Sequence, residues 1–249
     1  MRIGISIVLF NEPEERLIRF LETLHKVFCE RDYLVCVFYN SYHDFSLSDG
    51  IIQIQSEVNV GYGKGHNVNY AELKNRFCDK VLITNTDVNF KADVLELFNN
   101  SIAVVVAPEI LNIDDSNQGV VRYLPTLTDK IFSYFGVNRL SFKVINSDLH
   151  IVPSISGCFF VVNVNHYESL EYPWLFDPNY FMYEEDTDLC RRLWLAKGVY
   201  LLPKVKVQHS FAKGSSKSFK LFYFHLKSIL YYFWKWGCFD AESFKSKNI

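Results

Sequence analysis

The sequence lacks several features that would place a protein in a special class. Its six cysteines form no Cys-x-x-Cys pair and most lie inside apolar stretches, so we expect them to be reduced and structural. No apolar run reaches the ~18 residues that span a bilayer, and the N-terminus lacks the anatomy of a signal peptide. With only 11 Gly and 7 Pro in 249 residues and 49% hydrophobic residues, extensive disorder is excluded. We expect a well-packed globular protein that is made and kept in the cytoplasm.

An excess of charge of one sign is missing overall but present locally. The chain has 26 Lys and Arg against 28 Asp and Glu, and this net charge of -2 gives no sign of a nucleic-acid binder. Residues 213–249 nevertheless carry seven Lys and two acids, a local charge of +5 that leaves -7 on residues 1–212. We therefore predict one large domain over residues 1–212 and a distinct basic segment over residues 213–249.

Strand and helix patterns alternate along the chain. Short β-rich runs that end in polar residues alternate with stretches whose apolar residues recur at helical spacing. The strand patterns cover residues 3–10, 33–39, 51–55, 103–107, 155–162, 199–202 and 205–207, and the helical ones cover 14–29, 67–77, 92–98 and 128–135. This alternation predicts an α/β fold with a mostly parallel central sheet flanked by helices.

One further strand pattern, which begins at Val81, organises the rest of the chain. It is an apolar run that gives way abruptly to Thr84-Asn-Thr-Asp87. In open α/β sheets the ligand crevice lies outside the carboxyl ends of the strands, so a carboxylate at Asp87 can hold a metal ion against a bound phosphate group. An acid after a strand can equally be a turn former or a helix cap, so other stretches must point to the same site.

Three glycines, at positions 61, 63 and 65, precede the second helix pattern. A dinucleotide-binding fingerprint would need a further glycine at position 66, where the chain has His66. The glycines either allow a close approach of the backbone to another group or only turn the chain before the helix, and the sequence leaves both alternatives open.

The densest cluster of acids follows an aromatic stretch. Residues 176–183 are rich in Phe and Tyr and lead into Glu184-Glu-Asp-Thr-Asp188 and a helical pattern. Acids at a helix start suit capping and the helix dipole, and we assign that structural role to Glu184 and Asp188. Partial burial by the aromatic stretch would raise the pKa of a carboxyl group, which makes Asp186 and Glu185 candidates for a general base.

A histidine and a polar loop follow the last strand pattern. His209 stands at the end of that strand, and Gly214-Ser-Ser-Lys217 offers hydroxyls, amides and an ammonium group that can bind a diphosphate. His209 is therefore either a structural histidine or a metal ligand.

Taken together, the residues that end the strands resemble those of the inverting GT-A glycosyltransferases of the large bacterial family 2, especially its rhamnosyltransferase-like branch. The likeness covers nearly the whole chain and rests on residues 5–11, 59–67, 84–87, 156–158, 181–192 and His209 with 214–217. The Phe-Met-Tyr-Glu-Glu-Asp block that begins at Phe181 is the most specific. The resemblance implies a GT-A fold with a single nucleotide-sugar-binding domain, and we expect an amphipathic helical tail to follow it.

The resemblance also implies roles for individual residues. Asp186 matches the catalytic base, while Asp87 and His209 match ligands of a divalent metal, Mg²⁺ or Mn²⁺. The residues implied to surround the donor nucleotide and its diphosphate are Phe10, Asn11, Asn40, Ser41, Asn67, Asn85, Thr86 and Lys217.

The chain departs from the family pattern at two positions. Tyr39 stands where the family usually has an Asp beside the nucleotide base, and Asn85 stands where the metal motif usually begins with Asp. A single carboxylate brings less charge to the ion, so we expect metal binding to depend more on the phosphates of the substrate.

The C-terminal segment has a pattern of its own. Residues 219–239 carry ten aromatics interleaved with Lys220, Lys227 and Lys235, which is typical of a helix on an anionic membrane surface. The alternative is that its aromatic face packs on the catalytic domain or on a second copy of the chain in a homodimer.

These features lead to one expected function and one alternative. The expected function is the inverting transfer of a sugar, L-rhamnose from dTDP-rhamnose by resemblance, onto a lipid-linked glycan. This would take place at the inner face of the cell membrane, during synthesis of O-antigen or capsule. The alternative is a non-catalytic module that binds a nucleotide sugar or a glycan, favoured if Tyr39 and Asn85 reflect lost chemistry.

Overall fold

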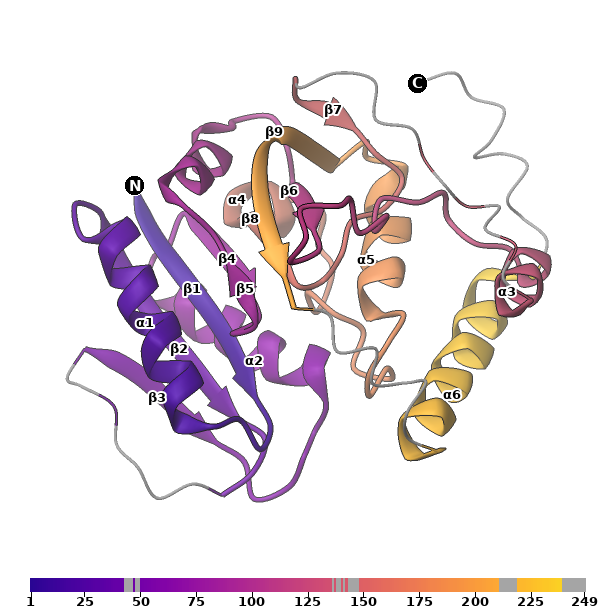
Figure 1. Cartoon of the computed structure of the whole chain (residues 1–249), viewed down its shortest axis with the longest axis horizontal. Coiled ribbons are helices and arrows are strands. Elements are labelled where there is room, and N and C mark those ends of the chain that lie inside the picture. Colours follow the sequence, from indigo (N-terminus) through magenta and orange to yellow (C-terminus); the bar gives the residue numbers. More distant parts are fainter. Residues whose placement is uncertain are drawn as a thin grey trace.

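The alternating patterns fold into one mixed sheet with helices on both faces, as the computed structural model shows (Figure 1). The structure describes residues 1–42, 47, 50–135, 137, 140, 142, 148–210 and 219–238. The strands are β1 (Arg2–Leu9), β2 (Asp32–Tyr39), β3 (Ile51–Gln55), β4 (Lys80–Thr84), β5 (Val88–Asn89), β6 (Val105–Leu111), β7 (His150–Ile151), β8 (Phe159–Asn163) and β9 (Val199–His209). The helices are α1 (Glu14–Phe28), α2 (Tyr62–Asn75), η1 (Ala92–Asn99), α3 (Leu127–Tyr134), α4 (Val164–Glu168), α5 (Glu185–Trp194) and α6 (Phe219–Trp236).

The sheet has the strand order β3-β2-β1-β4-β8-β6-β9-β5, with β7 paired to β9. The first half of the chain contributes the parallel run β3-β2-β1-β4. β8 pairs antiparallel with both β4 and β6, and β6 pairs in parallel with β9. The long ladders are thus mainly parallel, as expected, and β8 joins the second half of the chain to the first.

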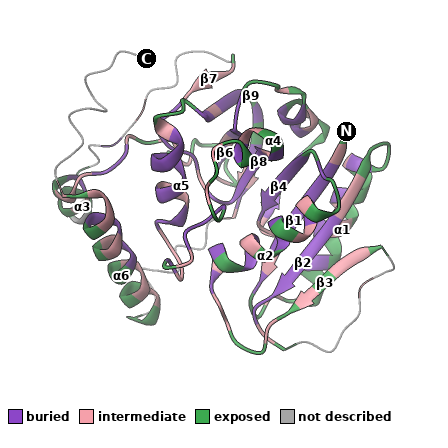
Figure 2. Ribbon diagram, turned by 180° about the vertical axis from the view of Figure 1, so that it is seen from behind, coloured by how far each residue is buried: buried purple, intermediate pink, exposed green. Residues whose placement is uncertain are grey.

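Two hydrophobic cores lie on the two faces of this sheet. One face packs against α1 and η1, through residues such as Leu17, Leu24 and Leu97. The other packs against α2, α4 and α5, through residues such as Leu73 and Leu189. The buried residues run through the centre of the sheet in Figure 2.

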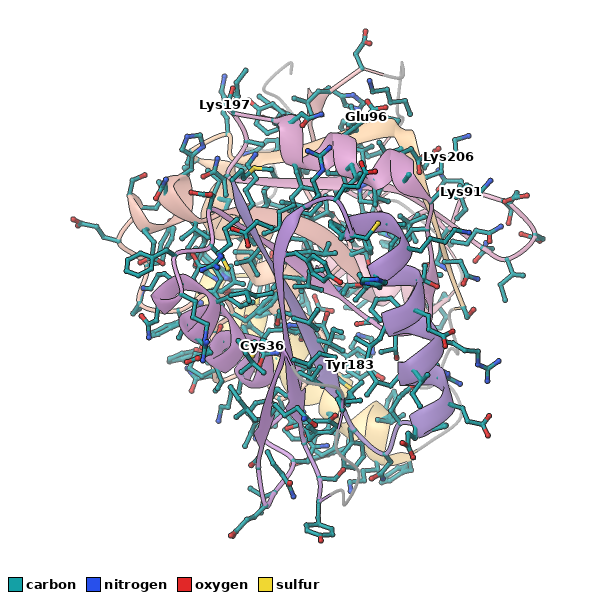
Figure 3. The ribbon with its side chains drawn as sticks, turned by 90° about the vertical axis from the view of Figure 1, so that its left-hand side faces the viewer. Cys36, Lys91, Glu96, Tyr183, Lys197 and Lys206 are labelled. Atoms are coloured by element: carbon teal, nitrogen blue, oxygen red, sulfur yellow. The ribbon has the colours of Figure 1, made fainter. Side chains whose placement is uncertain are left out.

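The molecule has a charged outer edge at η1 and β9. There Glu96 of η1 pairs with Lys204 of β9, with Oε2 and Nζ 2.5 Å apart. Figure 3 shows Glu96 and Lys206 on this edge, away from Tyr183.

The glycine stretch explains why α2 begins at Tyr62 and not at residue 67 as predicted. Gly61 has a left-handed backbone with φ +99°, and a Cβ there would lie 2.2 Å from Phe181 O. A Cβ on Gly63 would lie 2.9 Å from Phe176 Cβ. The glycines therefore serve a close approach, in which the first turn of α2 packs directly on the aromatic stretch.

Two other boundaries differ from the prediction for physical reasons. The strand predicted over residues 155–162 begins only at Phe159, because the chain turns through Gly157 before it. The two strands predicted over 199–202 and 205–207 are one strand, β9. Pro203 cannot donate to the ladder, and β9 shifts its register against β6 between Pro108 and Glu109 instead of ending.

Candidate active site

The pairing of β5 with β9 brings Asp87 and His209 together. Val88 pairs with His209 in the ladder, and Ser210 N donates to Asp87 O at 2.9 Å. His209 Nε2 lies 3.3 Å from Asp87 Oδ1. The two side chains that the resemblance assigned to a metal ion therefore face each other where the strands end.

The surroundings of His209 fix its orientation. Its Nδ1 lies 3.0 Å from Gln118 Oε1, and because an amide oxygen only accepts, Nδ1 carries a proton. Nε2 is thereby directed at Asp87. Burial lowers the pKa of His209, but hydrogen bonds to Asp87 and Cys158 outweigh burial and raise this pKa to about 10. A cation between Nε2 and the carboxylate would take the place of the second proton.

The chemistry of this pair fits a divalent cation. Asp87 Oδ1 is buried against His209 Nε2 at 3.3 Å, so this carboxylate oxygen and the imidazole nitrogen become available as ligands together when the imidazole gives up its second proton. In the described part of the chain, no group of three or more His, Cys, Asp or Glu side chains forms a ready metal cage. Mg²⁺ and similar ions are commonly held by one or two protein ligands together with substrate phosphates and water. Asp87 and His209 can therefore hold an ion that a diphosphate helps to bind.

Asp186 lies in the first turn of α5, where its carboxylate is held from two sides. Oδ2 accepts from Gly157 N at 2.9 Å, and Oδ1 accepts from Thr187 N at 2.8 Å. Gly157 permits this contact, because even a Cβ there would lie 3.3 Å from Asp186 Cβ. Burial raises the pKa of Asp186, and these two backbone N–H groups oppose the rise. A fixed carboxylate with raised proton affinity is what a general base requires.

Two consecutive residues connect Asp186 to the turn that bears Asp87. Gly157 N holds Asp186, while Cys158 O accepts from Asn85 N at 3.0 Å. Both contacts occur just before β8, whose first residues pair with the end of β4. The candidate base and the candidate metal ligands therefore lie on adjacent parts of one site.

Glu184 stands at the N-cap position of α5 and has a structural role, as expected, but its side chain acts through ion pairs and not through a capping hydrogen bond. Its backbone is left-handed with φ +65°, and its side chain makes no cap hydrogen bond. Its Oε1 lies 2.5 Å from Lys130 Nζ on α3 and 3.4 Å from His225 Nε2 on α6. Burial favours the neutral acid, but Lys130 and His225 prevail and lower the pKa of Glu184 to about 2. Glu184 thus clamps three helices together directly before the candidate base.

One face of α6 packs on the rest of the molecule. Tyr232 and Phe233 are buried, and Lys235 Nζ lies 2.7 Å from both Asp177 Oδ2 and Asp188 Oδ1. Asp188, expected to be structural, thus anchors α6. Figure 2 shows exposed residues on the other side of this helix, and the large apolar ones are Phe219, Phe222, Tyr223, Leu226, Leu230 and Trp234. Packing on the rest of the molecule therefore accounts for only one of its faces.

No helix in the described segments of the chain is both long enough and apolar enough to span a bilayer.

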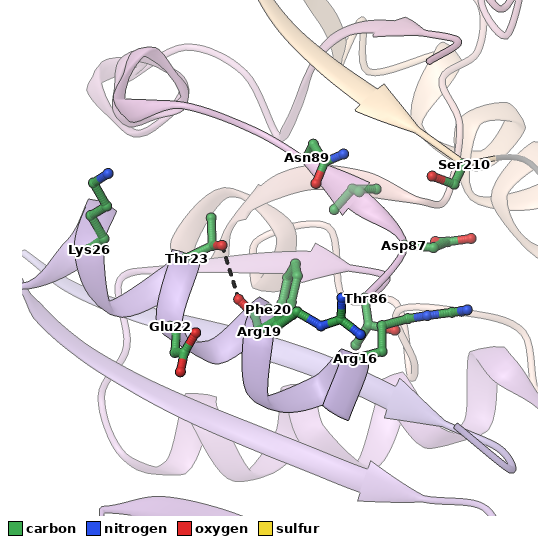
Figure 4. Close-up of a pocket in the computed structure, with 11 residues that line it drawn as sticks. Arg16, Arg19, Phe20, Glu22, Thr23, Lys26, Thr86, Asp87, Asn89 and Ser210 are labelled. Atoms are coloured by element: carbon green, nitrogen blue, oxygen red, sulfur yellow. Dashed lines mark hydrogen bonds between the residues drawn. The ribbon is translucent and has the colours of Figure 1, made fainter. Parts of the chain in front are cut away.

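Two cavities border the site. One of about 680 Å³ has Glu185 and Asp186 in its wall together with residues of α3 and α6, among them Lys130, Phe222 and Leu226. The other, of about 840 Å³, lies between α1 and the Asp87 turn. In Figure 4, Arg16 and Arg19 reach from α1 toward Thr86 and Asp87 in this second cavity.

Two of the residues expected around the nucleotide hold the protein's own backbone. Asn40 Oδ1 accepts a hydrogen bond from Val60 N at 2.9 Å, and its Nδ2 donates one to Gly61 O at 3.2 Å. Asn67 Oδ1 accepts a hydrogen bond from Phe176 N at 2.8 Å, and its Nδ2 donates one to Phe176 O at 2.6 Å. These side chains therefore fix the loop before α2 and the aromatic stretch before α5.

The other expected residues lie at the strand ends. Phe10 is 50% exposed, and Asn11 has a left-handed backbone with φ +52°. Ser41 is partly exposed, and Thr86 Oγ1 donates to Glu12 Oε1 at 3.0 Å. Lys217 and its loop lie outside the described residues.

The sequence analysis missed several contributors to the site. Gln118, Lys130 and His225 belong to no motif and reach the site only through long-range packing. Tyr62, whose hydroxyl donates to Gly157 O at 2.7 Å, was treated only as part of the glycine stretch. The cations of α1 had a signal, since Arg16, Arg19 and Lys26 recur at helical spacing.

The chain resembles known proteins in sequence and in structure. No family model matches the chain. The rhamnosyltransferase WbbL of Escherichia coli (strain K12) is 32% identical over 192 residues, which cover 69% of this chain and 69% of WbbL. S. aureus TarS 1-349 is similar in structure, with a TM-score of 0.57 and 16% identity over 84% of this chain and 60% of that one. The mannosyltransferase PcManGT from Pyrobaculum calidifontis, solved with GDP-Man and Mn²⁺, has a TM-score of 0.55 and 13% identity over 85% of this chain and 57% of that one.

The two solved structures are longer than this chain, which spans less than two thirds of each, and they bear on the fold alone. They confirm the expected α/β fold of the GT-A type. The identity to WbbL extends over more than two thirds of both sequences and bears on the family. The chain therefore belongs to the GT-A type glycosyltransferases, in the family that includes the rhamnosyltransferase WbbL.

Proposed function

We propose that this protein is a metal-dependent, inverting glycosyltransferase that moves L-rhamnose from dTDP-rhamnose onto a lipid-linked glycan in bacterial surface polysaccharide synthesis. The observation that carries the proposal is the link through Gly157 and Cys158. Gly157 N holds Asp186, and Cys158 O holds the turn that bears Asp87, 3.0 Å from Asn85 N. Two consecutive residues would thus hold both the base and the metal-binding carboxylate that a transfer from a diphosphate donor requires.

In this mechanism each end of the site has its own task. Asp87 and His209 would hold Mg²⁺ or Mn²⁺, which supplies positive charge to the departing nucleoside diphosphate. Asp186 would take the proton from the acceptor hydroxyl as that oxygen attacks the anomeric carbon from the opposite face. A single displacement of this kind inverts the anomeric configuration.

The donor half of the proposal is supported by the protein's relatives. WbbL is named as a rhamnosyltransferase, and PcManGT was solved with the nucleotide sugar GDP-Man and with Mn²⁺. The strand ends at Phe10, Asn11 and Ser41, with Asn85 and Thr86 beside the metal, would surround the nucleotide and its diphosphate. Asn40 and Asn67 would shape its walls.

The acceptor half is supported by α6 and by the cavity at Asp186. The exposed face of α6 carries Trp234 at 80% and Phe219 at 87% exposure, and the helix contains no Asp or Glu. Aromatic and basic helices of this kind bind anionic membrane surfaces. The protein would then work peripherally on the inner face of the cell membrane, where a lipid-linked acceptor is present.

The proposal is tested with a panel of nucleotide sugars, scored for release of nucleoside diphosphate with and without a chelator. We expect release from dTDP-rhamnose above all other donors, and its loss in excess chelator. Preference for another donor would replace rhamnose while leaving the transfer in place. Binding of a nucleotide sugar with no release under any condition would favour the non-catalytic binding module instead.

A further inference from the structure

Two acids of the block, Glu184 and Glu185, each have one buried carboxyl oxygen without a hydrogen bond to a described residue, and Glu185 differs because no described cation pairs with its carboxyl group. The residue is only 7% exposed, and its Oε2 is buried without a hydrogen bond to any described residue. Glu185 lines the same cavity of about 680 Å³ as Asp186. Buried polar atoms are nearly always satisfied, so an oxygen without a partner, on a residue that lines a cavity, favours a partner that enters from outside.

The three consecutive acids have three different environments. Glu184 is ionised, because Lys130 and His225 lower its pKa to about 2. Asp186 accepts two backbone N–H groups. No cation among the described residues pairs with Glu185, and burial, with the neighbouring carboxylates of Asp186 and Glu184, raises its pKa well above the usual value. This raised pKa favours the uncharged carboxylic acid, which offers one O–H donor and one acceptor oxygen.

The backbone keeps Glu185 in this position. A Cβ on Gly63 would lie 3.7 Å from Glu185 Cβ and 2.9 Å from Phe176 Cβ, so α2 packs closely beside it. Glu185 also comes directly after Glu184, whose left-handed backbone is held by the contacts of its side chain with α3 and α6. Such a group is held in advance of binding, which suits recognition better than a mobile surface acid does.

We propose that Glu185 is a specificity-determining residue that forms a hydrogen bond with a second hydroxyl of the acceptor sugar, while Asp186 takes the proton of the reacting hydroxyl. This rests on the proposed function, because it takes the cavity to be the acceptor site. The ligand class is a sugar with a free hydroxyl next to the one that attacks. That hydroxyl forms a hydrogen bond with Oε2, which has none with the described residues of the protein.

The test compares two substitutions of similar size. Glu185→Gln keeps an uncharged group with one donor and one acceptor side, whereas Glu185→Leu removes both. The probes are octyl glycosides of glucose, galactose, mannose and N-acetylglucosamine, together with monodeoxy analogues of the best of them. Initial rates give kcat and KM for donor and acceptor, and thermal unfolding reports the stability of each variant.

We expect Glu185→Gln to keep the acceptor KM within about threefold, and Glu185→Leu to raise it by about 10- to 100-fold, the range for an unpaired polar group in a binding site. The donor KM stays constant. Because Leu removes an unsatisfied buried oxygen, the melting temperature of Glu185→Leu stays equal to or above that of the wild type. For one deoxy analogue, the acceptor KM of the wild type should rise by the same factor. The acceptor KM of Glu185→Leu should be the same for this analogue as for the parent glycoside.

Other outcomes overturn the inference. One is an acceptor KM that Glu185→Leu leaves unchanged. Another is an acceptor KM that Glu185→Gln raises as much as Glu185→Leu does, which would mean that a carboxylate is needed. Release of nucleoside diphosphate that no glycoside stimulates above the rate with water would refute the acceptor site but leave the donor half of the proposed function standing. The absence of release from every donor would defeat the proposed function itself, and this inference with it.

Discussion

The clamp at Glu184 allows a quantitative prediction of stability. Its pKa falls from 4.5 to about 2 on folding, and the side chain is 4% exposed, so solvent screening is small. At 1.36 kcal/mol per pKa unit, the ionised carboxylate contributes ~3 kcal/mol to folding at pH 7. Glu184→Gln keeps the shape but removes the charge. Lys130 and His225 are 24% and 34% exposed and remain hydrated, so we expect the variant to lose about that amount.

The pH dependence gives this prediction its sign. A carboxyl group whose pKa is lowered by folding stabilises the folded state fully above its unfolded pKa, here near 4.5. This stabilisation is lost as the pH falls through its folded pKa, near 2. The gap between wild type and Glu184→Gln should therefore shrink from ~3 kcal/mol at pH 7 to ~2 kcal/mol at pH 3.5.

Urea denaturation of both proteins at the two pH values measures this gap. Glu96→Gln is the control, since Glu96 and Lys204 are about half exposed, 45% and 51%, and such pairs contribute less than ~1 kcal/mol. A Glu184→Gln loss no larger than that of Glu96→Gln, or a gap that is the same at both pH values, would refute the clamp.

Three further predictions concern the metal, the glycines and the outer face of α6. Asp87→Ala should abolish transfer, and His209→Ala should weaken the dependence on Mn²⁺; a metal titration that His209→Ala leaves unchanged would remove His209 from the site. Gly61→Ala should cost ~3 kcal/mol or more in urea denaturation, because its Cβ would lie 2.2 Å from Phe181 O. Gly50→Ala, with a similar φ of +97° and no neighbour within 4 Å, should cost only ~1 kcal/mol, and equal losses would contradict the collision. Trp234→Ser should reduce sedimentation with anionic liposomes and leave folding intact, whereas unchanged binding would exclude this face.

Much of the fold could be predicted because its signals are local. The ends of β1, β2 and β4 follow from apolar runs that stop at polar residues, and α1 and the helix at 92–99 follow from helical spacing. Asp87, Asp186 and His209 could be singled out because each stands where a strand or helix begins or ends. Their order along the chain then suggested the family to which WbbL belongs.

What could not be predicted depends on contacts between distant residues. The start of α2 is set by the collision that Gly61 avoids with Phe181, and no local pattern contains that neighbour. The partners of Glu184, Lys130 and His225, are 54 and 41 residues away. α6 has aromatic residues on all sides, so its composition alone could not tell which face packs and which is exposed.

The central claim is that Asp186 is the base of a sugar transfer, and single-turnover kinetics test it most directly. Asp186→Asn keeps the size of the side chain but cannot take the proton of the acceptor. We expect unchanged donor and metal affinity and a transfer rate lower by ~10² to 10⁴, the usual contribution of a general base. Glu185→Gln, measured beside it, should lose far less. A mild defect in Asp186→Asn together with a severe one in Glu185→Gln would contradict the account and give the role of base to the neighbouring residue.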